Sequence, residues 1–248
     1  MDRPQKLRTV LIQIDMQALI LADGAFPTTH HRQELLKKAE NIVCCDGAIG
    51  KLLDFGREPV AIVGDMDSIS AELKVQFADR IHQVTEQETN DLTKAVEYCI
   101  SKGYDEIAIL GATGLREDHT LGNIALLADY APRLKSVCLL TDYGRIDAFR
   151  SGMSVDDFNV PGLDAMAPEV CTTRNGAYTV ARFQSFQGQQ VSIFALTPDA
   201  QISSLGLRYP LENRNLTSWW QGTLNESAGE QFSISIDQGI LLIYRLDR

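Results

Sequence analysis

Two aspartates separated by one residue form a compact pair of potential metal ligands. Asp65 and Asp67 lie in the segment Gly64-Asp65-Met66-Asp67-Ser68, directly after the apolar run Val60–Val63. On an extended segment, carboxylates at positions i and i+2 project to the same side. Their repulsion is unfavourable near a buried edge unless a cation compensates it. Oxygen ligands at this density favour Mg²⁺, which typically binds through one or two carboxylates together with substrate phosphates.

Carboxylates follow other strand-like runs in the same way. Asp46 comes directly after Ile42–Cys45, and Asp91 follows the loop after Ile81–Val84. In an open parallel α/β sheet, ligands bind in the crevice beyond the carboxyl ends of the strands. We therefore expect these aspartates to lie at the same sheet edge as residues 64–68.

A purely structural explanation stays open for several of these residues. Gly and Asp form turns and cap helices, and Asp23, at the end of another strand-like run, is interpreted as a turn residue only. Asp91 and Asp118 could be carboxylates at helix N-termini, where the helix dipole favours them. The prediction of a site therefore depends on Asp65 and Asp67 together with their partners.

The segment Gly111–His119 has the features of an anion-binding loop. Glycines at 111 and 114 let the backbone approach a bulky anion. Arg116 carries a forked cation that suits phosphate oxygens. The spacing matches neither the P-loop nor the dinucleotide-binding fingerprint. Together with the aspartates, this loop predicts Mg²⁺-dependent chemistry on a polyphosphate.

Strand-like runs alternate with segments of helical periodicity through the first 141 residues. Runs such as Ile107–Leu110 are apolar on both faces, which is typical of strands between helix layers. This alternation predicts a mostly parallel sheet. The expected strands are Val10–Ile14, Ala18–Ala22, Ile42–Cys45, Val60–Val63, Ile81–Val84, Ile107–Leu110 and Val137–Leu140. The expected helices are Thr29–Ala39, Ala48–Phe55, Ala71–Ala78, Asp91–Lys102 and His119–Tyr130.

The pattern changes after about Thr141, where helical periodicity gives way to short strands and turns. Several runs alternate apolar and polar residues, as half-exposed antiparallel strands do. The expected strands are Arg145–Phe149, Tyr178–Phe186, Gln190–Leu196, Ile202–Leu207, Phe232–Ile236 and Ile240–Tyr244. We therefore expect an α/β fold: an N-terminal three-layer domain with a mostly parallel sheet (1–141), followed by a C-terminal all-β sandwich domain (142–248) with an insertion at about 155–176.

Composition excludes several classes of protein. The chain has 248 residues, with 23 Lys and Arg against 33 Asp and Glu, and this acidic balance argues against nucleic-acid binding through a basic face. No apolar run approaches the roughly 20 residues that span a bilayer, and the N-terminal residues lack the pattern of a signal peptide. Five cysteines without CxxC spacing suggest neither a disulfide framework nor a zinc site. A reduced cytoplasmic protein, with no nucleic-acid or membrane partner, is expected.

These segments, in this order, resemble the thiamine pyrophosphokinase family. The blocks that carry the resemblance are Asp46-Gly47-Ala48, Gly64–Ile69, Glu88–Asp91 with Lys94-Ala95, Gly111–His119 with Asn123, Gly206–Leu211, and Asn225-Glu226. Each block is weak alone, but their order and spacing from residue 46 to residue 226 are specific.

The resemblance implies transfer of the pyrophosphoryl group of ATP to the hydroxyl of thiamine, which gives thiamine diphosphate and AMP. It also implies a homodimer in which each active site combines the α/β domain of one subunit with the β-domain of the other. Two alternatives stay open: a pyrophosphokinase for another hydroxymethyl heterocycle such as a pterin, and a non-catalytic nucleotide-sensing module. The C-terminal blocks favour thiamine, and the full set of aspartates favours catalysis.

The residue pattern and the resemblance together assign roles to individual side chains. Asp65 and Asp67 are expected to be the principal Mg²⁺ ligands, with Asp46 and Asp91 as supporting ligands. Asp118 is expected to act as a base or orienting group for the thiamine hydroxyl, or in a role linked to the metal. ATP is expected to contact Ser68, Asn90, Lys94, Gly111, Thr113, Gly114, Arg116 and His119. Thiamine is expected to contact Tyr209, Asn225, Trp219 and Trp220.

Some of these assignments have structural alternatives or depart from the family pattern. Trp219 and Trp220 are equally at home in a β core or an interface, and His119 could be a helix-surface imidazole. The family usually has Thr just before the equivalent of Asp91, and this chain has Asn90 there. Ala112 and Leu115 stand at positions of the glycine loop where the family usually has glycine or another small residue. Leu224 replaces the usual Ser before Asn225, which removes one polar contact to thiamine.

Overall fold

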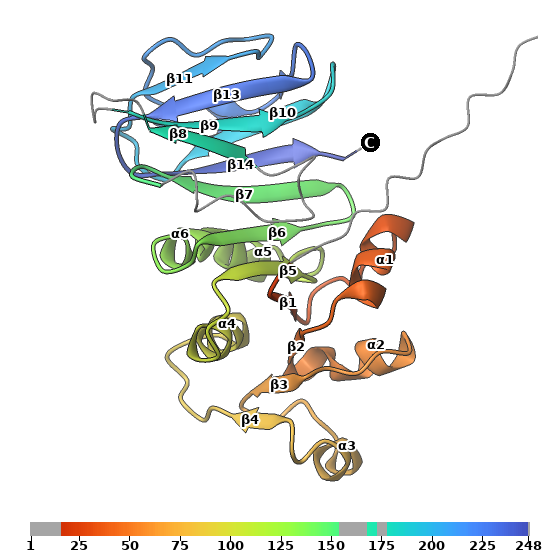
Figure 1. The fold of residues 1–248 in the computed structure, drawn as a ribbon. Coiled ribbons are helices and arrows are strands. Elements are labelled where there is room, and N and C mark those ends of the chain that lie inside the picture. Colours follow the sequence, from red (N-terminus) through yellow and green to blue (C-terminus); the bar gives the residue numbers. More distant parts are fainter. Residues whose placement is uncertain (1–15, 154–167, 173–177, 248) are drawn as a thin grey trace, which may run out of the picture.

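A ten-stranded sheet runs the length of the molecule (Figure 1). The computed structural model describes residues 16–153, 168–172 and 178–247, and the expected strand Val10–Ile14 lies outside them. In spatial order, the strands of this sheet are β12 (Asn225–Glu226), β10 (Gln190–Ala195), β14 (Ile240–Leu246), β7 (Gly144–Arg150), β6 (Ser136–Leu140), β5 (Glu106–Leu110), β1 (Ala18–Leu21), β2 (Ile42–Cys45), β3 (Ala61–Gly64) and β4 (Ile81–Gln83).

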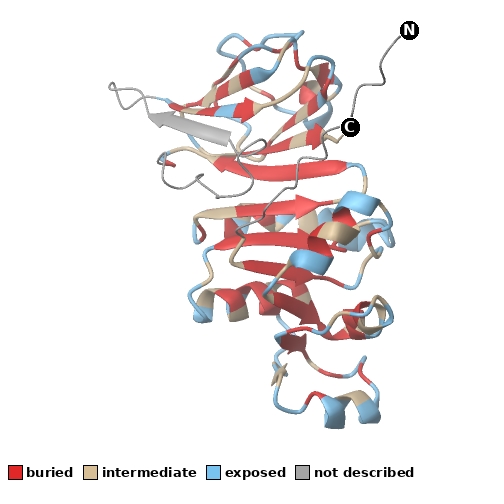
Figure 2. Ribbon diagram, turned by 45° about the vertical axis from the view of Figure 1, so that its right-hand side comes forward, coloured by how far each residue is buried: buried red, intermediate tan, exposed pale blue. Residues whose placement is uncertain are grey.

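The strands from β6 to β4 are parallel, as the apolar runs predicted. Every residue of β1, β2, β3 and β5 is buried, which Figure 2 shows as a continuous buried centre. Because both faces of these strands are covered, both faces are apolar.

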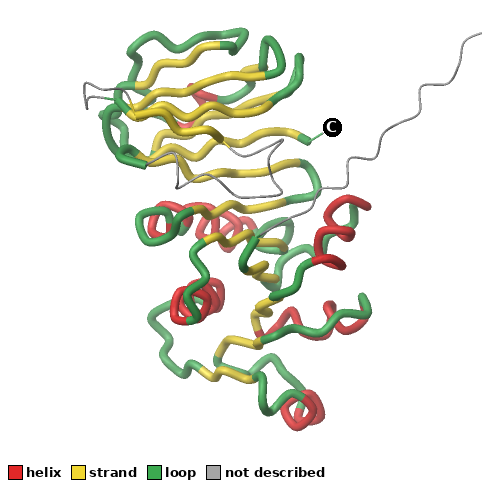
Figure 3. Tube along the Cα trace, viewed as in Figure 1, coloured by secondary structure: helices red, strands yellow, loops and turns green. Residues whose placement is uncertain are grey.

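Helices cover the two faces of the parallel half and complete the three expected layers (Figure 3). They are α1 (His30–Lys38), α2 (Ile49–Asp54), α3 (Ala71–Gln76), α4 (Asp91–Ser101), α5 (Glu117–Ala125) and α6 (Leu127–Tyr130). Helices α1 and α2 pack on one face through Leu36 and Leu52. Helices α4 and α6 pack on the other through Val96 and Leu127. The expected helix 119–130 is divided into α5 and α6. No helix among the described residues has the length and apolar character needed to cross a membrane.

The remaining strands form a β-sandwich, as expected. β11 (Ile202–Leu205), β13 (Gln231–Ile236), β9 (Thr179–Gln184) and β8 (Pro168–Thr172) make a four-stranded antiparallel sheet. This sheet packs against β7, β14 and β10 through a buried apolar core that includes Phe183, Phe232 and Ile243. The rings of Phe183 and Phe232 stack with centroids 4.9 Å apart.

The two halves share one sheet rather than meeting as separate sheets. β7 pairs antiparallel with β6, so the expected border after residue 141 falls in the turn that joins them. Five residues of the expected insertion form β8 and pair with β9, for example Val170 with Ala181. Periodicity did not predict β8 or the two-residue strand β12.

Candidate active site

A cavity of about 450 Å³ lies at the carboxyl ends of the central parallel strands. β1 lies between β5 and β2 in the sheet. The chain runs from β1 to β2 on one side and from β5 to β6 on the other, and open α/β sheets bind ligands at such a reversal of strand order. The lining of the cavity comes from residues 22 to 123 only. The expected site residues that line it are Asp65, Asn90, Asp91, Lys94, Thr113, Arg116 and His119.

Three expected metal ligands converge beside this cavity. One carboxylate oxygen from each of Asp46, Asp65 and Asp67 lies within 4.8 Å of the others. Asp46 directly follows β2 and Asp65 directly follows β3, and parallel pairing of these strands, with Cys45 opposite Val63, brings their ends together. The expectation that these carboxylates share one sheet edge is confirmed.

The segment between Asp65 and Asp67 is a turn, and the extended conformation assumed from the sequence is wrong. Met66 has a left-handed backbone (φ 70°), and its side chain is buried in the core under α2. Its backbone N–H donates to Asp46 Oδ2 at 2.9 Å, and the N–H of Asp67 donates to Asp65 Oδ1 at 3.2 Å. The turn therefore directs both carboxylates to the Asp46 side.

Gly64 allows this close approach. A Cβ at Gly64 would lie 2.6 Å from Cγ of Asp46, a separation that real Cβ atoms essentially never show. Asp46 can lie against this backbone only because the side chain is absent. The glycine before Asp65 thus has a packing role, which the motif alone does not reveal.

The electrostatics of the group fit a bound cation. Burial raises the pKa of the Asp46 carboxyl, and the nearby Asp91 raises it further. Hydrogen bonds from the Asp67 backbone and from Gln87 lower the pKa of Asp65. Burial and a neighbouring carboxylate disfavour the charged form of Asp46, whereas hydrogen bonds to the charged form favour it at Asp65. All three converging ligands are oxygens, which suits Mg²⁺.

The N-terminus of α4 is tied to the glycine loop through Asn90. The Asn90 side chain accepts from the backbone N–H of Thr93 and so caps the helix. Its amide donates to Asn123 Oδ1 at 3.1 Å, and Asn123 donates to the Ala112 carbonyl at 2.8 Å. Asn90 was expected to contact the nucleotide, but its amide group is largely used within the protein.

Lys94 is the buried cation of the site. Only 3% of its side chain is exposed, and Nζ lies 3.2 Å from Oδ1 of Asp91. Asp91 begins α4 and is itself partly exposed to the cavity. The pair places one positive charge and one carboxylate at the cavity wall.

The glycines of the 111–119 loop serve close packing rather than lining the cavity. Gly111 and Gly114 both have positive φ, and a Cβ at Gly111 would lie 2.5 Å from the Ala22 carbonyl oxygen. At Gly114 it would lie 2.7 Å from Cβ of Ala25. The residues between them, Ala112 and Thr113, line the cavity instead. Neither glycine lines the cavity itself, and the expected contact of these two residues with the nucleotide stays a prediction.

Arg116 and Asp118 form an exposed ion pair at the cavity mouth. Arg116 Nη2 lies 2.5 Å from Asp118 Oδ2, and the side chains are 71% and 62% exposed. The hydrogen bond from Arg116 lowers the pKa of Asp118. Arg116 lines the cavity, whereas Asp118 and Ser68 do not.

The expected thiamine residues lie elsewhere in the chain. Asn225 is buried, and its Oδ1 accepts from the backbone N–H of Tyr209 and of Glu226 while its amide donates to the Tyr209 carbonyl. Asn225 therefore fixes the backbone of Tyr209, whose side chain is exposed. Trp219 packs edge-on against Phe194 with ring centroids 6.1 Å apart.

Sequence reasoning did not assign every lining residue to the site, and Asp23 and Gln87 are two polar residues that it missed. Asp23 lines the cavity and forms an ion pair with Lys51 at 2.7 Å. The rule that found Asp46, a carboxylate directly after a strand, also applies to Asp23, but no neighbouring motif supported it. Gln87 also lines the cavity and donates to Asp65 at 3.2 Å, and only its closeness to the 88–91 block could have indicated it.

Comparison with known proteins gives the family. The domain model for "Thiamin pyrophosphokinase, catalytic domain" matches residues 32–139, and the model for "Thiamin pyrophosphokinase, substrate-binding domain" matches residues 175–244. The chain belongs to the thiamin pyrophosphokinase family. The converging aspartates all lie in the catalytic match of this family, and Tyr209 and Asn225 lie in the substrate-binding match.

Individual relatives agree with this family assignment. Thiamine pyrophosphokinase of Bacillus subtilis (strain 168) is 27% identical over 202 residues, which cover 78% of this chain and 81% of that protein. Thiamine pyrophosphokinase 1 of Oryza sativa subsp. japonica is 25% identical over 209 residues, which cover 74% of this chain and 70% of that protein.

Solved structures of thiamin pyrophosphokinases share the fold. The Geobacillus thermodenitrificans enzyme has a TM-score of 0.68 at 21% identity and covers 93% of this chain and 97% of its own. The Candida albicans enzyme has a TM-score of 0.68 at 19% identity, and the match covers 93% of this chain and 89% of that enzyme. The α/β half followed by an antiparallel β half is therefore the architecture of this family.

Proposed function

We propose that this chain transfers the pyrophosphoryl group of ATP to the hydroxyl of thiamine and releases AMP. The observation that carries the proposal is the convergence of Asp46, Asp65 and Asp67 beside a cavity that also presents Arg116 and Lys94. Carboxylates alone would repel a triphosphate, whereas carboxylates with a divalent cation and two basic side chains would hold it. The pterin and nucleotide-sensing alternatives gain no support from the family matches.

The residues fit one or more Mg²⁺ ions. Asp65 and Asp67 would be the principal ligands, with Asp46 and Asp91 in support. When bound, Mg²⁺ neutralises charge and aligns the attacking and leaving oxygens of a phosphoryl transfer. Arg116, which lines the cavity, would bind phosphate oxygens with its forked guanidinium.

The chain's own groups would then organise the transfer. The thiamine hydroxyl oxygen forms a bond to the β-phosphorus of ATP, and the bond from that phosphorus to the oxygen bridging the α-phosphate breaks. AMP leaves with that oxygen, and the hydroxyl proton passes to a base. Asp118 would serve as this base, or orient the hydroxyl, once its partner Arg116 contacts phosphate.

The position of the thiamine residues favours a homodimer with shared active sites. Seven strand spacings separate β12, which contains Asn225, from β2, which precedes Asp46. At about 4.8 Å per spacing, the two lie roughly 30 Å apart along the sheet. Tyr209, Trp219 and Trp220 of one subunit would therefore complete the site of another. In this proposal residues 1–141 bind ATP and Mg²⁺, and residues 142–248 bind thiamine and form the dimer.

One assay tests the reaction directly. Purified protein is incubated with ATP, Mg²⁺ and thiamine, and AMP and thiamine diphosphate are resolved by chromatography. We expect equal amounts of the two products, formed only when both thiamine and Mg²⁺ are present. A hydroxymethyl pterin serves as the competing acceptor. AMP release that depends on the pterin and not on thiamine would refute the proposal.

A further inference from the structure

An ion pair at the edge of the cavity has no role in the proposed transfer. Lys51 Nζ lies 2.7 Å from Asp23 Oδ1 and also donates to the Gly24 carbonyl at 3.0 Å. The side chains of Asp23 and Lys51 are 51% and 39% exposed. Asp23 lines the cavity, but it precedes the region that matches the family's catalytic domain.

The surrounding backbone fixes the position of the Asp23 carboxylate. Asp23 directly follows Ala22 at the end of β1, between the ends of β5 and β2. The backbone N–H of Gly24 donates to the Gly111 carbonyl at 2.5 Å, which locks this turn to the glycine loop. A Cβ at Gly47 would collide with Asp23 Oδ2, so the carboxylate lies directly against that backbone.

Asp23 is chemically distinct from the metal-binding aspartates. Among the described residues, the carboxylates that converge as a potential metal site are Asp46, Asp65 and Asp67, and Asp23 is not one of them. Its Oδ1 is occupied by Lys51. A carboxylate directed at phosphates would repel them, so its partner in a bound nucleotide should be a hydrogen-bond donor.

The vicinal hydroxyls of ribose are such donors. In open α/β sheets that bind nucleotides, an acidic side chain commonly accepts hydrogen bonds from the ribose. The neighbouring wall suits a nucleoside, because Leu115, an apolar side chain 61% exposed, also lines the cavity. Asp91 and Lys94 make another part of the lining polar, and the phosphates and cation belong there.

We propose that Asp23, oriented by Lys51, accepts hydrogen bonds from the ribose hydroxyls of the donor nucleotide and determines its preference for ribonucleotides. The inference rests on the proposed function in taking ATP as the donor. Lys51 is a positioning residue: it engages one carboxylate oxygen and leaves the other for a hydroxyl.

Binding of the product nucleotide tests the proposal without turnover. AMP and 2′-deoxy-AMP are titrated by calorimetry into the wild-type chain and into Asp23→Ala, Asp23→Asn and Lys51→Met. A hydrogen bond to a charged group predicts that wild type binds AMP about tenfold or more tightly than 2′-deoxy-AMP. Asp23→Ala should weaken AMP binding by about the same factor and leave 2′-deoxy-AMP within about threefold. Asp23→Asn, which keeps one acceptor oxygen, and Lys51→Met should fall between.

Glu58→Ala is the matched control, because it breaks an ion pair with Arg80 of similar exposure away from the cavity. It should leave the ratio between the two nucleotides unchanged. The proposal is overturned if wild type binds neither nucleotide, if it does not discriminate, or if Asp23→Ala weakens both nucleotides equally. A chain that shows the Asp23-dependent preference but makes no thiamine diphosphate would refute the transfer reaction and leave the ribose contact standing.

Discussion

At the scale of single residues, the site depends on how three carboxylates are brought together. Asp46 is buried and accepts two backbone N–H groups, while Asp65 and Asp67 stand progressively more exposed above it. The hydrogen bonds fix the direction of the buried member, and the two exposed members can adjust to an ion. The group therefore combines one carboxylate of fixed orientation, Asp46, with two that a metal ion can reach from solvent.

Asp65→Asn should remove turnover while leaving the fold intact. The substitution replaces a charged ligand by a neutral one at a partly exposed position, so we expect kcat to fall by at least about a hundredfold. Circular dichroism and Tm should stay close to wild type in EDTA. Asp79→Asn, which changes an exposed acid outside the cavity, is the control and should retain full activity. Near-normal activity of Asp65→Asn would remove Asp65 from the site.

Mg²⁺ should stabilise the wild-type chain against thermal unfolding and should not stabilise Asp65→Asn. A ligand that binds only the folded state at ten times its Kd contributes about 1.4 kcal/mol, which corresponds to a Tm rise of about 3–6 °C for a chain of this size. Thermal unfolding with Mg²⁺ against EDTA measures the effect. An equal rise in wild type and Asp65→Asn would show that the ion binds elsewhere.

At the scale of elements, glycines decide whether strand ends can approach each other. Gly64→Ala places a Cβ 2.6 Å from Asp46 Cγ, so Asp46 or the end of β3 must move. We expect a loss of about 1–3 kcal/mol in the free energy of unfolding and a fall in activity. Gly50→Ala is the matched control: it lies in α2 with nothing within 4 Å of its Cβ, so helix propensity predicts no loss of stability. Equal stability of the two variants would contradict the packing argument.

Sequence periodicity predicted most elements because burial on both faces leaves a strong apolar signal. β1, β2, β3 and β5 follow such runs closely. β12 has two residues, too few for any periodicity. The turn at Met66 was wrongly taken as extended, since a non-glycine residue gives no sequence signal of positive φ.

The site was predicted where strand ends and motifs coincide, and missed where the partner comes from another element. Asp46 and Asp65 each directly follow a strand, and parallel pairing brings these two strand ends together. The turn at Met66 then directs Asp67 to the same side. Asp23 also follows a strand, but its significance depends on Lys51 of α2, 28 residues along the chain. Sequence spacing does not reveal such a contact between different elements.

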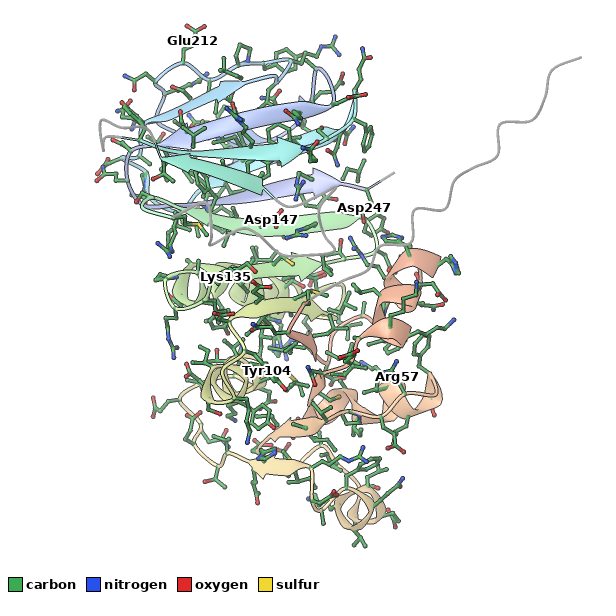
Figure 4. The ribbon with its side chains drawn as sticks, in the orientation of Figure 1. Arg57, Tyr104, Lys135, Asp147, Glu212 and Asp247 are labelled. Atoms are coloured by element: carbon green, nitrogen blue, oxygen red, sulfur yellow. The ribbon has the colours of Figure 1, made fainter. Side chains whose placement is uncertain are left out.

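At the scale of the whole molecule, one sheet joins the two halves, and a buried charge cluster lies near the junction. Asp147 on β7, labelled in Figure 4, is 2% exposed. It accepts from Arg145 at 2.5 Å and from Arg245 of β14 at 2.7 Å. Both arginines are buried, so the carboxylate balances two desolvated cations.

Asp147→Ala should therefore destabilise the molecule strongly. Removing one member of a buried ionic group leaves charge uncompensated, and we expect a loss of about 3–5 kcal/mol in urea unfolding. Glu97→Ala, which breaks an exposed pair with Arg133, should cost less than about 1 kcal/mol. Because β7 belongs to both halves of the sheet, the α/β half and the β half should still unfold in a single transition. A small effect of Asp147→Ala would show that the arginines are accommodated without it.

Shared active sites predict that two inactive variants restore each other. Asp65→Asn removes a proposed metal ligand in one half, and Tyr209→Ala removes a proposed thiamine contact in the other, so each homodimer should have two defective sites. Mixed dimers contain one site with both defects and one with neither, because the two halves of a site come from different subunits. Co-expression with two affinity tags isolates these mixed dimers, and their activity should be about half that of wild type per dimer, since one of two sites is intact. If all residues of a site came from one chain, every site would carry one defect, and the mixed dimers would be as inactive as their parents.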